Sequence, residues 1–263
     1  RENQGLYAFY GYTNREPVRN DYIDAPQGNV PTPESMHNIE LGYDLRSERL
    51  AFTANYYLMY YQNQLVLTGE LNDVGSSIRT NVDESYRTGI ELSANYKILE
   101  TLILGGNLTL SRNRISTFKE VIPAFDESFG PAPNIENEYS NVPITLSPEV
   151  ISGVTLNWMP IKGSEITWFS KYVGRQYLDN TGNEERSIDP FFVNDIRASY
   201  TIESAGFIKE IKIKALVNNV LNELYSANGY TYSYAVGEDV ITENFYYPQA
   251  TTNFLIGLDL LFN

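Results

Sequence analysis

The chain has 263 residues and a formal net charge of −14, which disfavours nucleic acid as a partner because a phosphate backbone binds basic surfaces. It contains no cysteine, so disulfides, thiolate metal sites and cysteine nucleophiles are excluded. No run approaches the roughly 20 apolar residues of a membrane helix. The mean hydropathy of −0.32 is compatible with a β-barrel, because only alternate residues of a barrel strand face lipid.

The first half of the chain is predicted to form strands at residues 6–13, 36–45, 51–67, 87–96 and 101–115. Apolar and polar residues alternate along them, which is the side-chain period of a β-strand. In the strand at 101–115, one face carries Leu102, Leu104, Leu108 and Leu110. The opposite face carries Asn107, Thr109, Ser111 and Asn113. Each strand therefore has one apolar and one polar face.

The second half is predicted to form strands at residues 148–158, 165–177, 191–200, 209–220 and 254–262. The last strand alternates most regularly, and its apolar face consists of Phe254, Ile256, Leu258, Leu260 and Phe262. Gly257 and Asp259 lie on its other face. We expect the apolar face to contact lipid and Asp259 to face a hydrated lumen.

The predicted connections alternate between short and long. Short turns lie near residues 46–49, 97–100, 159–163 and 203–206, and long loops at residues 14–35, 68–86, 119–146, 178–188 and 222–247. We therefore predict an all-β chain that forms a transmembrane antiparallel up-and-down β-barrel, with about ten strands present, turns in the periplasm and loops outside the cell. The alternative, a soluble β-sandwich or propeller, has shorter strands and more even connections. Tyrosine and tryptophan near the predicted strand ends favour the barrel, because interfacial girdles use such rings.

Several motifs resemble those of TonB-dependent outer-membrane receptors. Residues 31–45, PTPESMHNIELGYDL, resemble the segment in which a Pro-Glu pair leads into a strand carrying Glu-Leu-Gly. Residues 14–17 resemble the family's arginine–x–proline loop. Residues 195–200 and 216–225 resemble its late strands, and residues 247–262 its closing strand. The style of the loops and strands is similar to that of receptors from Bacteroides-like bacteria.

The resemblance implies the C-terminal part of a barrel of about 22 strands, with a plug domain in its lumen. Residues 1–263 are then a C-terminal transmembrane β-barrel segment with no plug domain in this chain. The family ends on an aromatic residue that the barrel-assembly machinery recognises. Phe262 corresponds to it, although Asn263 follows here.

The resemblance further implies an outer-membrane receptor and transporter, not an enzyme. It imports a large scarce nutrient of the iron-siderophore, haem or cobalamin class with energy supplied by TonB. The implied partners are outer-membrane lipid and lipopolysaccharide, TonB through the plug region, and a small-molecule nutrient. Two alternatives remain open: a glycan importer that works with a surface lipoprotein, and a passive porin or structural barrel without a plug.

The sequence offers several candidate ligand-binding residues on loops and no predicted catalytic residue, metal site or cofactor. His37, the single histidine, is either a haem-iron ligand or substrate contact, or an ordinary rim residue. Arg15, Arg19 and Tyr22 share one loop, where guanidinium groups suit carboxylates or phosphates but equally suit neighbouring loop acids.

A tyrosine-rich loop and four acidic clusters complete the candidates. Tyr230 and Tyr232 offer stacking surfaces and hydroxyls for a ring-bearing ligand or sugar, or they pack loop on loop. The acidic clusters either bind Ca²⁺ or cationic groups, or form solvated loop surface. Their members are Glu120, Asp126 and Glu127; Glu136 and Glu138; Glu184 and Glu185; and Glu238, Asp239 and Glu243.

Overall fold

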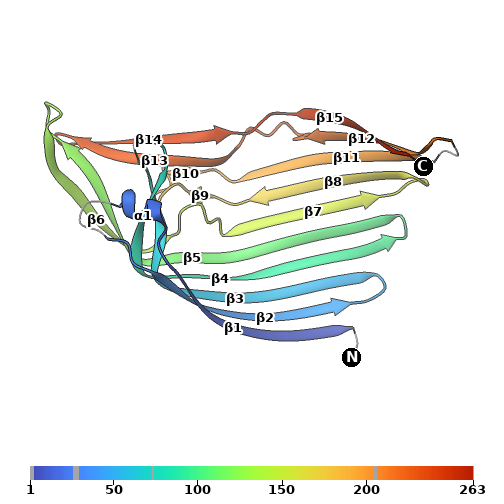
Figure 1. Cartoon of the computed structure of the whole chain (residues 1–263), viewed down its shortest axis with the longest axis horizontal. Coiled ribbons are helices and arrows are strands. Elements are labelled where there is room, and N and C mark those ends of the chain that lie inside the picture. The colour runs from blue at the N-terminus through green and yellow to red at the C-terminus, as the bar shows by residue number, and fades with distance from the viewer. Residues whose placement is uncertain (1–2, 26–29, 73, 204–205, 263) are drawn as a thin grey trace.

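A computed structural model describes residues 3–25, 30–72, 74–203 and 206–262. Long antiparallel strands lie side by side and form one large sheet (Figure 1). The elements, in chain order, are β1 (Gln4–Arg15), α1 (Arg19–Ile23), β2 (Glu34–Arg46), β3 (Leu50–Leu71), β4 (Ser77–Leu99), β5 (Leu102–Phe125), β6 (Pro131–Pro143), β7 (Val150–Trp158), β8 (Ser164–Val173), β9 (Gln176–Tyr177), β10 (Ser187–Ile188), β11 (Phe191–Glu203), β12 (Ile208–Asn218), β13 (Ser226–Val236), β14 (Asp239–Pro248) and β15 (Asn253–Phe262). Among these residues, no helix has the length and apolar character that crossing a membrane requires.

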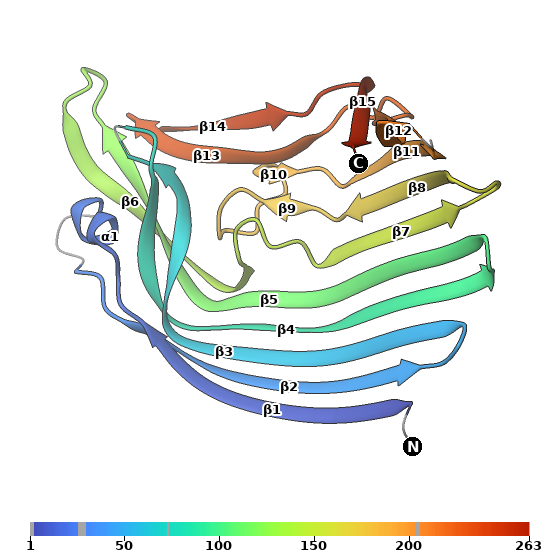
Figure 2. The same cartoon turned by 45° about the vertical axis from the view of Figure 1, so that its right-hand side comes forward.

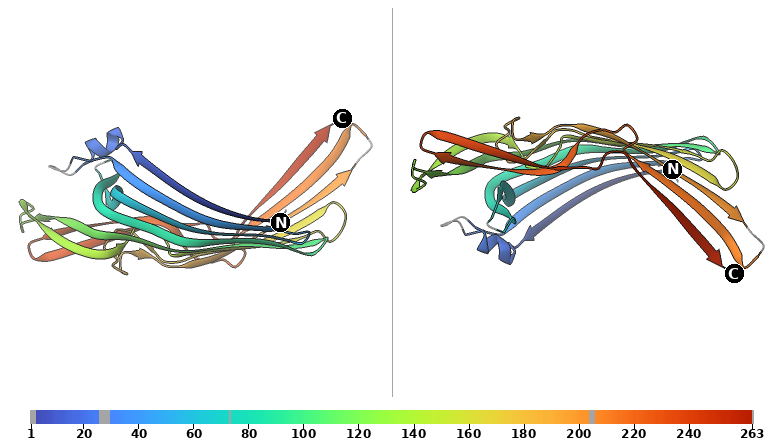
Figure 3. Two further views of the ribbon diagram at one scale, coloured as in Figure 1. Left: turned by 90° about the horizontal axis from the view of Figure 1, so that it is seen from below. Right: turned by 90° about the horizontal axis from the view of Figure 1, so that it is seen from above.

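Ten strands form a continuous path in the order β1-β2-β3-β4-β5-β7-β8-β11-β12-β15. This path confirms the prediction of about ten antiparallel strands joined as neighbours along the chain. Within the described residues, β1 and β15 are the margins of the path and each pairs with one neighbour. The sheet is curved, not flat, as Figures 2 and 3 show from three further directions. We call this ten-strand path the wall.

The predicted two faces are present because the strands pair in a register that aligns apolar side chains. One row crosses seven strand pairings and contains Leu50, Tyr96, Leu104, Leu156, Trp168, Ile196, Val217 and Phe254. Large members of this face are solvent-exposed, including Ile256 at 76% and Leu258 at 60%. An exposed apolar face of this extent requires an apolar environment to cover it. On the other face, Lys214 of β12 forms an ion pair with Asp259 of β15.

The long loops are more ordered than the sequence predicted. The strands β3 and β4 extend into the expected loop at 68–86, and β5 and β6 fill most of the expected loop at 119–146. The hairpin of β13 and β14 occupies most of residues 222–247. Smaller corrections are α1 within the expected irregular loop at 14–35, and β9 and β10 around residues 178–188.

The sequence pattern does not predict these strand extensions, for a physical reason. Beyond the apolar belt a strand no longer needs an oily face, so backbone pairing persists while the alternation of apolar residues ends. A small core instead packs the hairpin β3–β4 against β5–β6. It consists of Val66, Val82, Ile115, Phe118, Val142 and Ile144, with Tyr139 packed against it. Part of β13 then pairs in parallel with the tip of β5, where Ala235 lies opposite Ala124.

We call the end of the wall that carries α1 and the hairpins β5–β6 and β13–β14 the loop end (Figure 2). The opposite end, the turn end, carries the short connections such as the one between Arg46 and Leu50. This arrangement confirms the predicted alternation of short and long connections.

Candidate functional site: the polar face and the loop end

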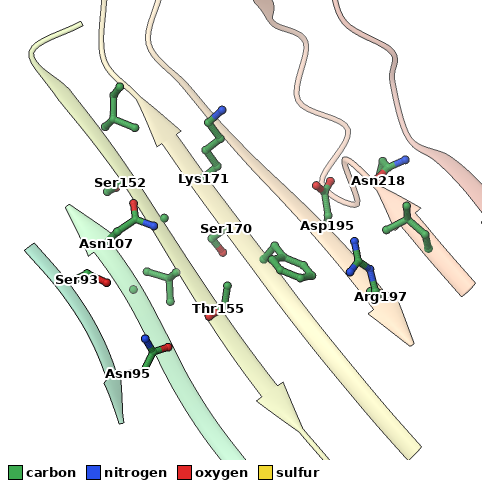
Figure 4. A pocket seen from close by; sticks show the side chains of 16 residues that line it. Ser93, Asn95, Asn107, Ser152, Thr155, Ser170, Lys171, Asp195, Arg197 and Asn218 are labelled. Carbon is green, nitrogen blue, oxygen red and sulfur yellow. The ribbon is translucent and has the colours of Figure 1, made fainter. Parts of the chain in front are cut away.

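A hollow of about 520 Å³ lies on the polar face of the wall, over strands β4 to β12. Polar side chains from successive strands line it, including Asn107, Lys171, Asp195 and Arg197 (Figure 4). The guanidinium of Arg197 lies 5.4 Å from the ring centroid of Phe169, within cation–π range. The hollow therefore combines amide, hydroxyl and charged groups on a rigid sheet.

A second hollow of about 600 Å³ shares Arg197 and extends toward the turn end. Lys212 and Lys214 add two cations to it, and Glu165 is held by Asn157 through a hydrogen bond of 2.9 Å. Lysine ammonium groups and a carboxylate on a hydrated face suit contact with a polar surface or a charged solute. The prediction that the strands have a polar, lumen-facing side agrees with these two hollows.

A buried ion-pair network organises the loop end. Arg186 donates to the Glu120 carboxylate at 2.5 Å and to the Asp179 carboxylate at 2.9 Å, and all three residues are largely buried. Burial alone would lower the pKa of Arg186, but the hydrogen bonds and charges of Glu120 and Asp179 outweigh it and raise that pKa. Tyr139 also donates to Glu120, at 2.9 Å. The network joins residues 178–188 to strands β5 and β6.

Asn180 makes a second connection beside this network. Its side chain is fully buried; it accepts from the backbone N–H of Thr145 at 2.8 Å and donates to the carbonyl of Leu67 on β3. On the other side, Asn244 of β14 donates to the carbonyl of Glu185 at 2.8 Å. Residues 178–188 therefore tie three hairpins together and give the loop end a defined shape.

The arginines and tyrosine expected near residues 14–22 lie at the loop end of β1 and on α1. Arg15 forms an ion pair with Glu34 at 3.0 Å, so it has the neighbouring-acid partner that the sequence analysis considered. Arg19 and Tyr22 are exposed on α1. Asp21 anchors this helix, because its buried carboxylate accepts from the N–H of Val18 at 2.8 Å and pairs with Arg79 at 3.2 Å.

His37 lies on the apolar face of the wall, not on the polar face. The register places it opposite Tyr12, on the same face as Ile39 and Leu41. Its Nδ1 and the hydroxyl of Tyr10 are 2.9 Å apart, and its ring centroid lies 4.9 Å from that of Tyr12. The structure therefore groups His37 with tyrosines and away from the two hollows.

Tyr230 and Tyr232 belong to a ladder of aromatic rings on the hairpin of β13 and β14. The ring of Phe245 is nearly parallel to both, with centroid distances of 4.9 Å to Tyr230 and 5.8 Å to Tyr232. A hydrogen bond to the Glu243 carboxylate raises the pKa of Tyr232 to about 12. Tyr247 continues the ladder beside Tyr230. These rings form one partly exposed stacking surface.

The remaining predicted residues lie elsewhere. Phe262 lies at the turn end, where its ring is 5.2 Å from that of Phe207. The acidic clusters do not converge: across the described ranges, no three histidine or carboxylate side chains are placed to hold a metal ion. Asp126, for example, accepts from the N–H groups of Ser128 and Gly130 and so holds a turn.

Sequence reasoning missed the role of Arg186 and Asn180. Arg186 is 66 residues from Glu120, and no local pattern reveals a pairing at that distance. A partial signal was present in the segment DNTGN at residues 179–183, because such residues form side-chain-stabilised turns. The turn exists: Asp179 accepts from the N–H of Thr181 at 2.9 Å.

The two-faced antiparallel wall with alternating short and long connections defines a transmembrane β-barrel protein. A family model described as "TonB dependent receptor-like, beta-barrel" matches residues 1–220. The chain belongs to this family of TonB-dependent receptors, whose β-barrels lie in the outer membrane of Gram-negative bacteria. The apolar face of the wall therefore faces lipid and the polar face lines the lumen.

Several solved structures share this fold. The ferric-catecholate import receptor Fiu of E. coli K12, in its closed form, matches with a TM-score of 0.65 and 17% identity over 98% of this chain and 33% of that chain. The copper transporter OprC matches with a TM-score of 0.68 and 16% identity over 98% and 37%. The siderophore receptor PiuA of Acinetobacter baumannii matches with a TM-score of 0.67 and 14% identity over 98% and 34%.

This chain spans about a third of the length of those proteins. At such low identities the similarity establishes the fold, not the ligand. A comparison with curated protein sequences gave no match.

Proposed function

We propose that this chain is the C-terminal barrel segment of an importer that takes up a large scarce nutrient, of the iron-siderophore, haem or cobalamin class, with energy from TonB. The observation that carries the proposal is the two-faced wall of a TonB-dependent receptor barrel, whose lumen face is polar and charged around Arg197. In this proposal the wall belongs to a barrel of about 22 strands that encloses a plug. The plug, not the wall, contacts TonB.

The margins of the wall support the larger barrel. In lipid, an unpaired strand edge leaves backbone N–H and C=O groups without hydrogen bonds, which costs several kcal/mol per group. The strands β1 and β15 each have one neighbour within the described residues. Both edges therefore require further strands, and we propose that the same receptor supplies them.

The loop end supplies the proposed contact surface for the nutrient. Exposed Arg19 and Tyr22 on α1 offer a cation and a ring, and the ladder around Tyr230 and Tyr232 offers a stacking surface. Guanidinium groups suit anionic chelates, and stacked rings suit flat ligands. The Arg186 network and Asn244 hold residues 178–188 against the hairpins, so the ladder is presented from a fixed framework. The helix α1 is held separately, by the ion pair of Asp21 with Arg79.

The direct test is uptake by cells that carry the complete receptor. Deletion of the receptor should abolish growth on one iron or vitamin source, and a TonB deletion should abolish it equally. Binding of that nutrient to the purified receptor should survive without TonB, because TonB supplies energy and not affinity. Uptake that continues without TonB, or a large open-pore current in bilayers without ligand, would contradict the proposal and favour a passive pore.

A further inference from the structure

The hairpin of β13 and β14, which carries the ladder of aromatic rings, leaves the wall between β12 and β15 (Figure 1). We call residues 219–225, which lead into the hairpin, the outgoing leg, and residues 249–252, which lead back to β15, the return leg. At the base of the two legs, Asn218 of β12 lies opposite Asn253 of β15, although these residues are 35 positions apart in the chain. Closing so long a loop costs conformational entropy, so contacts that join the legs compensate a definite cost.

Asn219, the first residue of the outgoing leg, is fixed to the wall. It is buried, with 3% of its surface exposed. Its φ of 51° lies in the left-handed region, which asparagine tolerates better than most residues. In this conformation its N–H donates to the Asp195 carboxylate of β11 at 2.7 Å.

The side-chain amide of Asn219 binds both legs. Its oxygen accepts from the N–H of Glu223 at 2.9 Å, and its nitrogen donates to the carbonyl of Glu223 at 2.8 Å. The same nitrogen donates to the carbonyl of Ala250 on the return leg at 3.2 Å. In the other direction, the hydroxyl of Thr252 donates to the Asn219 carbonyl at 2.7 Å. One buried amide therefore satisfies backbone groups of two segments that are far apart in the sequence.

Neighbouring residues of the outgoing leg repeat this pattern. The side-chain amide of Asn218 donates to that of Asn253 at 2.9 Å. The carbonyl of Tyr225, at the far end of the leg, accepts from the N–H of Gln249 at 2.9 Å. Residues 216–225, whose sequence resembles a late strand of the family, therefore clamp the return leg along its length.

We propose that Asn219 is a positioning residue for nutrient binding, because it clamps both legs of the hairpin and so fixes the base of the ladder on the wall. Tyr247 lies at that end of the ladder, directly before Pro248 and the return leg, and its ring centroid is 6.2 Å from that of Tyr230. Asn244 holds the middle of the hairpin against residues 178–188 and leaves the base to the clamp. Only the contact between the ladder and the nutrient rests on the proposed function.

The simpler alternative is that Asn219 only ends β12. That role requires the left-handed backbone and nothing more, and glycine supplies this conformation at no steric cost. Asn219→Gly therefore keeps the turn and removes the three hydrogen bonds of the side chain to Glu223 and Ala250. Asn219→Asp places an oxygen against the two carbonyls that the amide nitrogen had satisfied, so it should be at least as damaging.

Hydrogen-exchange mass spectrometry of the complete receptor measures the clamp. Asn219→Gly should speed exchange in residues 220–225 and 249–252 roughly a hundredfold, the factor that three ordinary hydrogen bonds contribute together, whereas exchange within β13 and β14 stays near the parental rate. Thr252→Val, which removes one hydroxyl donor, should speed it about fivefold. The matched control is Asn141→Gly, because Asn141 is an exposed asparagine with a φ of 54° whose side chain has no hydrogen-bond partner in the described ranges. This control should exchange like the parent.

Ligand binding separates a positioning role from a merely structural one. A ferric catecholate chelate, haemin and cyanocobalamin are titrated against the parent, and a probe that binds is then titrated against the variants. Asn219→Gly should weaken its binding about tenfold, because the rings at the base of the ladder must then be ordered when the probe binds. Barrel assembly is checked separately by the shift in gel migration between heated and unheated samples.

Two results would overturn the proposal. Parental exchange in a correctly assembled Asn219→Gly variant would show that the amide does not hold the legs. Faster exchange with parental affinity would show a structural joint without a positioning role. If Asn219→Gly does not assemble, Thr252→Val carries the same two measurements. A parent that binds none of the three probes would contradict the proposed nutrient classes, and the exchange result would still decide whether the clamp exists.

Discussion

Replacing Arg186 with leucine tests whether one buried guanidinium holds the loop end together. The substitution removes the partner of two carboxylates, Glu120 and Asp179, whose side chains are 11% and 7% exposed. Removing one member of a buried ion pair costs roughly 3–5 kcal/mol, because the other charge is left buried without compensation. Here two such charges remain close together, so we expect the loss to lie within or above that range.

The predicted loss is local and does not affect the lipid-spanning strands. Residues 178–188 should detach from β5 and β14, and their backbone amides should exchange hydrogen about a hundredfold to a few thousandfold faster than in the parent. Hydrogen-exchange mass spectrometry of the complete receptor measures this directly, peptide by peptide.

The matched control is Arg175→Leu in the neighbouring segment. Arg175 pairs with Glu184 at 2.5 Å, but Glu184 is 74% exposed, so water compensates its charge when the arginine is removed. Exchange in residues 178–188 should then remain at the parental level. Unchanged exchange in a correctly assembled Arg186→Leu variant would refute the claim that this network fixes the loop end.

Three further predictions concern other parts of the chain. Leu108→Arg on the lipid face should destabilise the barrel by roughly 2–4 kcal/mol near the midplane. Thr109→Arg on the lumen face, where it lies opposite Glu91, should assemble normally. The difference in gel migration between heated and unheated samples distinguishes the two variants, because it reports on barrel assembly. Glu243→Gln should lower the pKa of Tyr232 from about 12 toward its ordinary value, which an ultraviolet titration records; an unchanged titration would mean that Glu243 is not the cause. Arg19→Ala should weaken nutrient uptake at an unchanged protein level, and full uptake would leave Arg19 with no role in binding.

The pattern of residues determined the architecture of the wall. The regular alternation in residues 254–262 appears in the structure as an apolar row on β15, with Asp259 paired to Lys214 on the other face. Alternation is a local property with a period of two, so it is readable wherever one strand face meets lipid and the other meets water. For the same reason the ten spanning strands and their short turns were predicted close to their observed positions.

Tertiary structure alone decided what lies beyond the lipid. The extended parts of β3–β4 and β5–β6 have no oily face to reveal them, because backbone pairing and a small shared core hold them. The hairpin of β13 and β14 is held by its own backbone pairing and by pairing with the tip of β5. Tertiary structure also brought His37 within hydrogen-bonding distance of Tyr10 on β1, a partner that the alternation along one strand does not identify. The ion pairs of Arg186 depend on residues 66 and 7 positions away that meet only when the hairpins pack. Sequence patterns record the solvent that each strand face meets, but contacts between distant loops arise only from the packing of the folded chain.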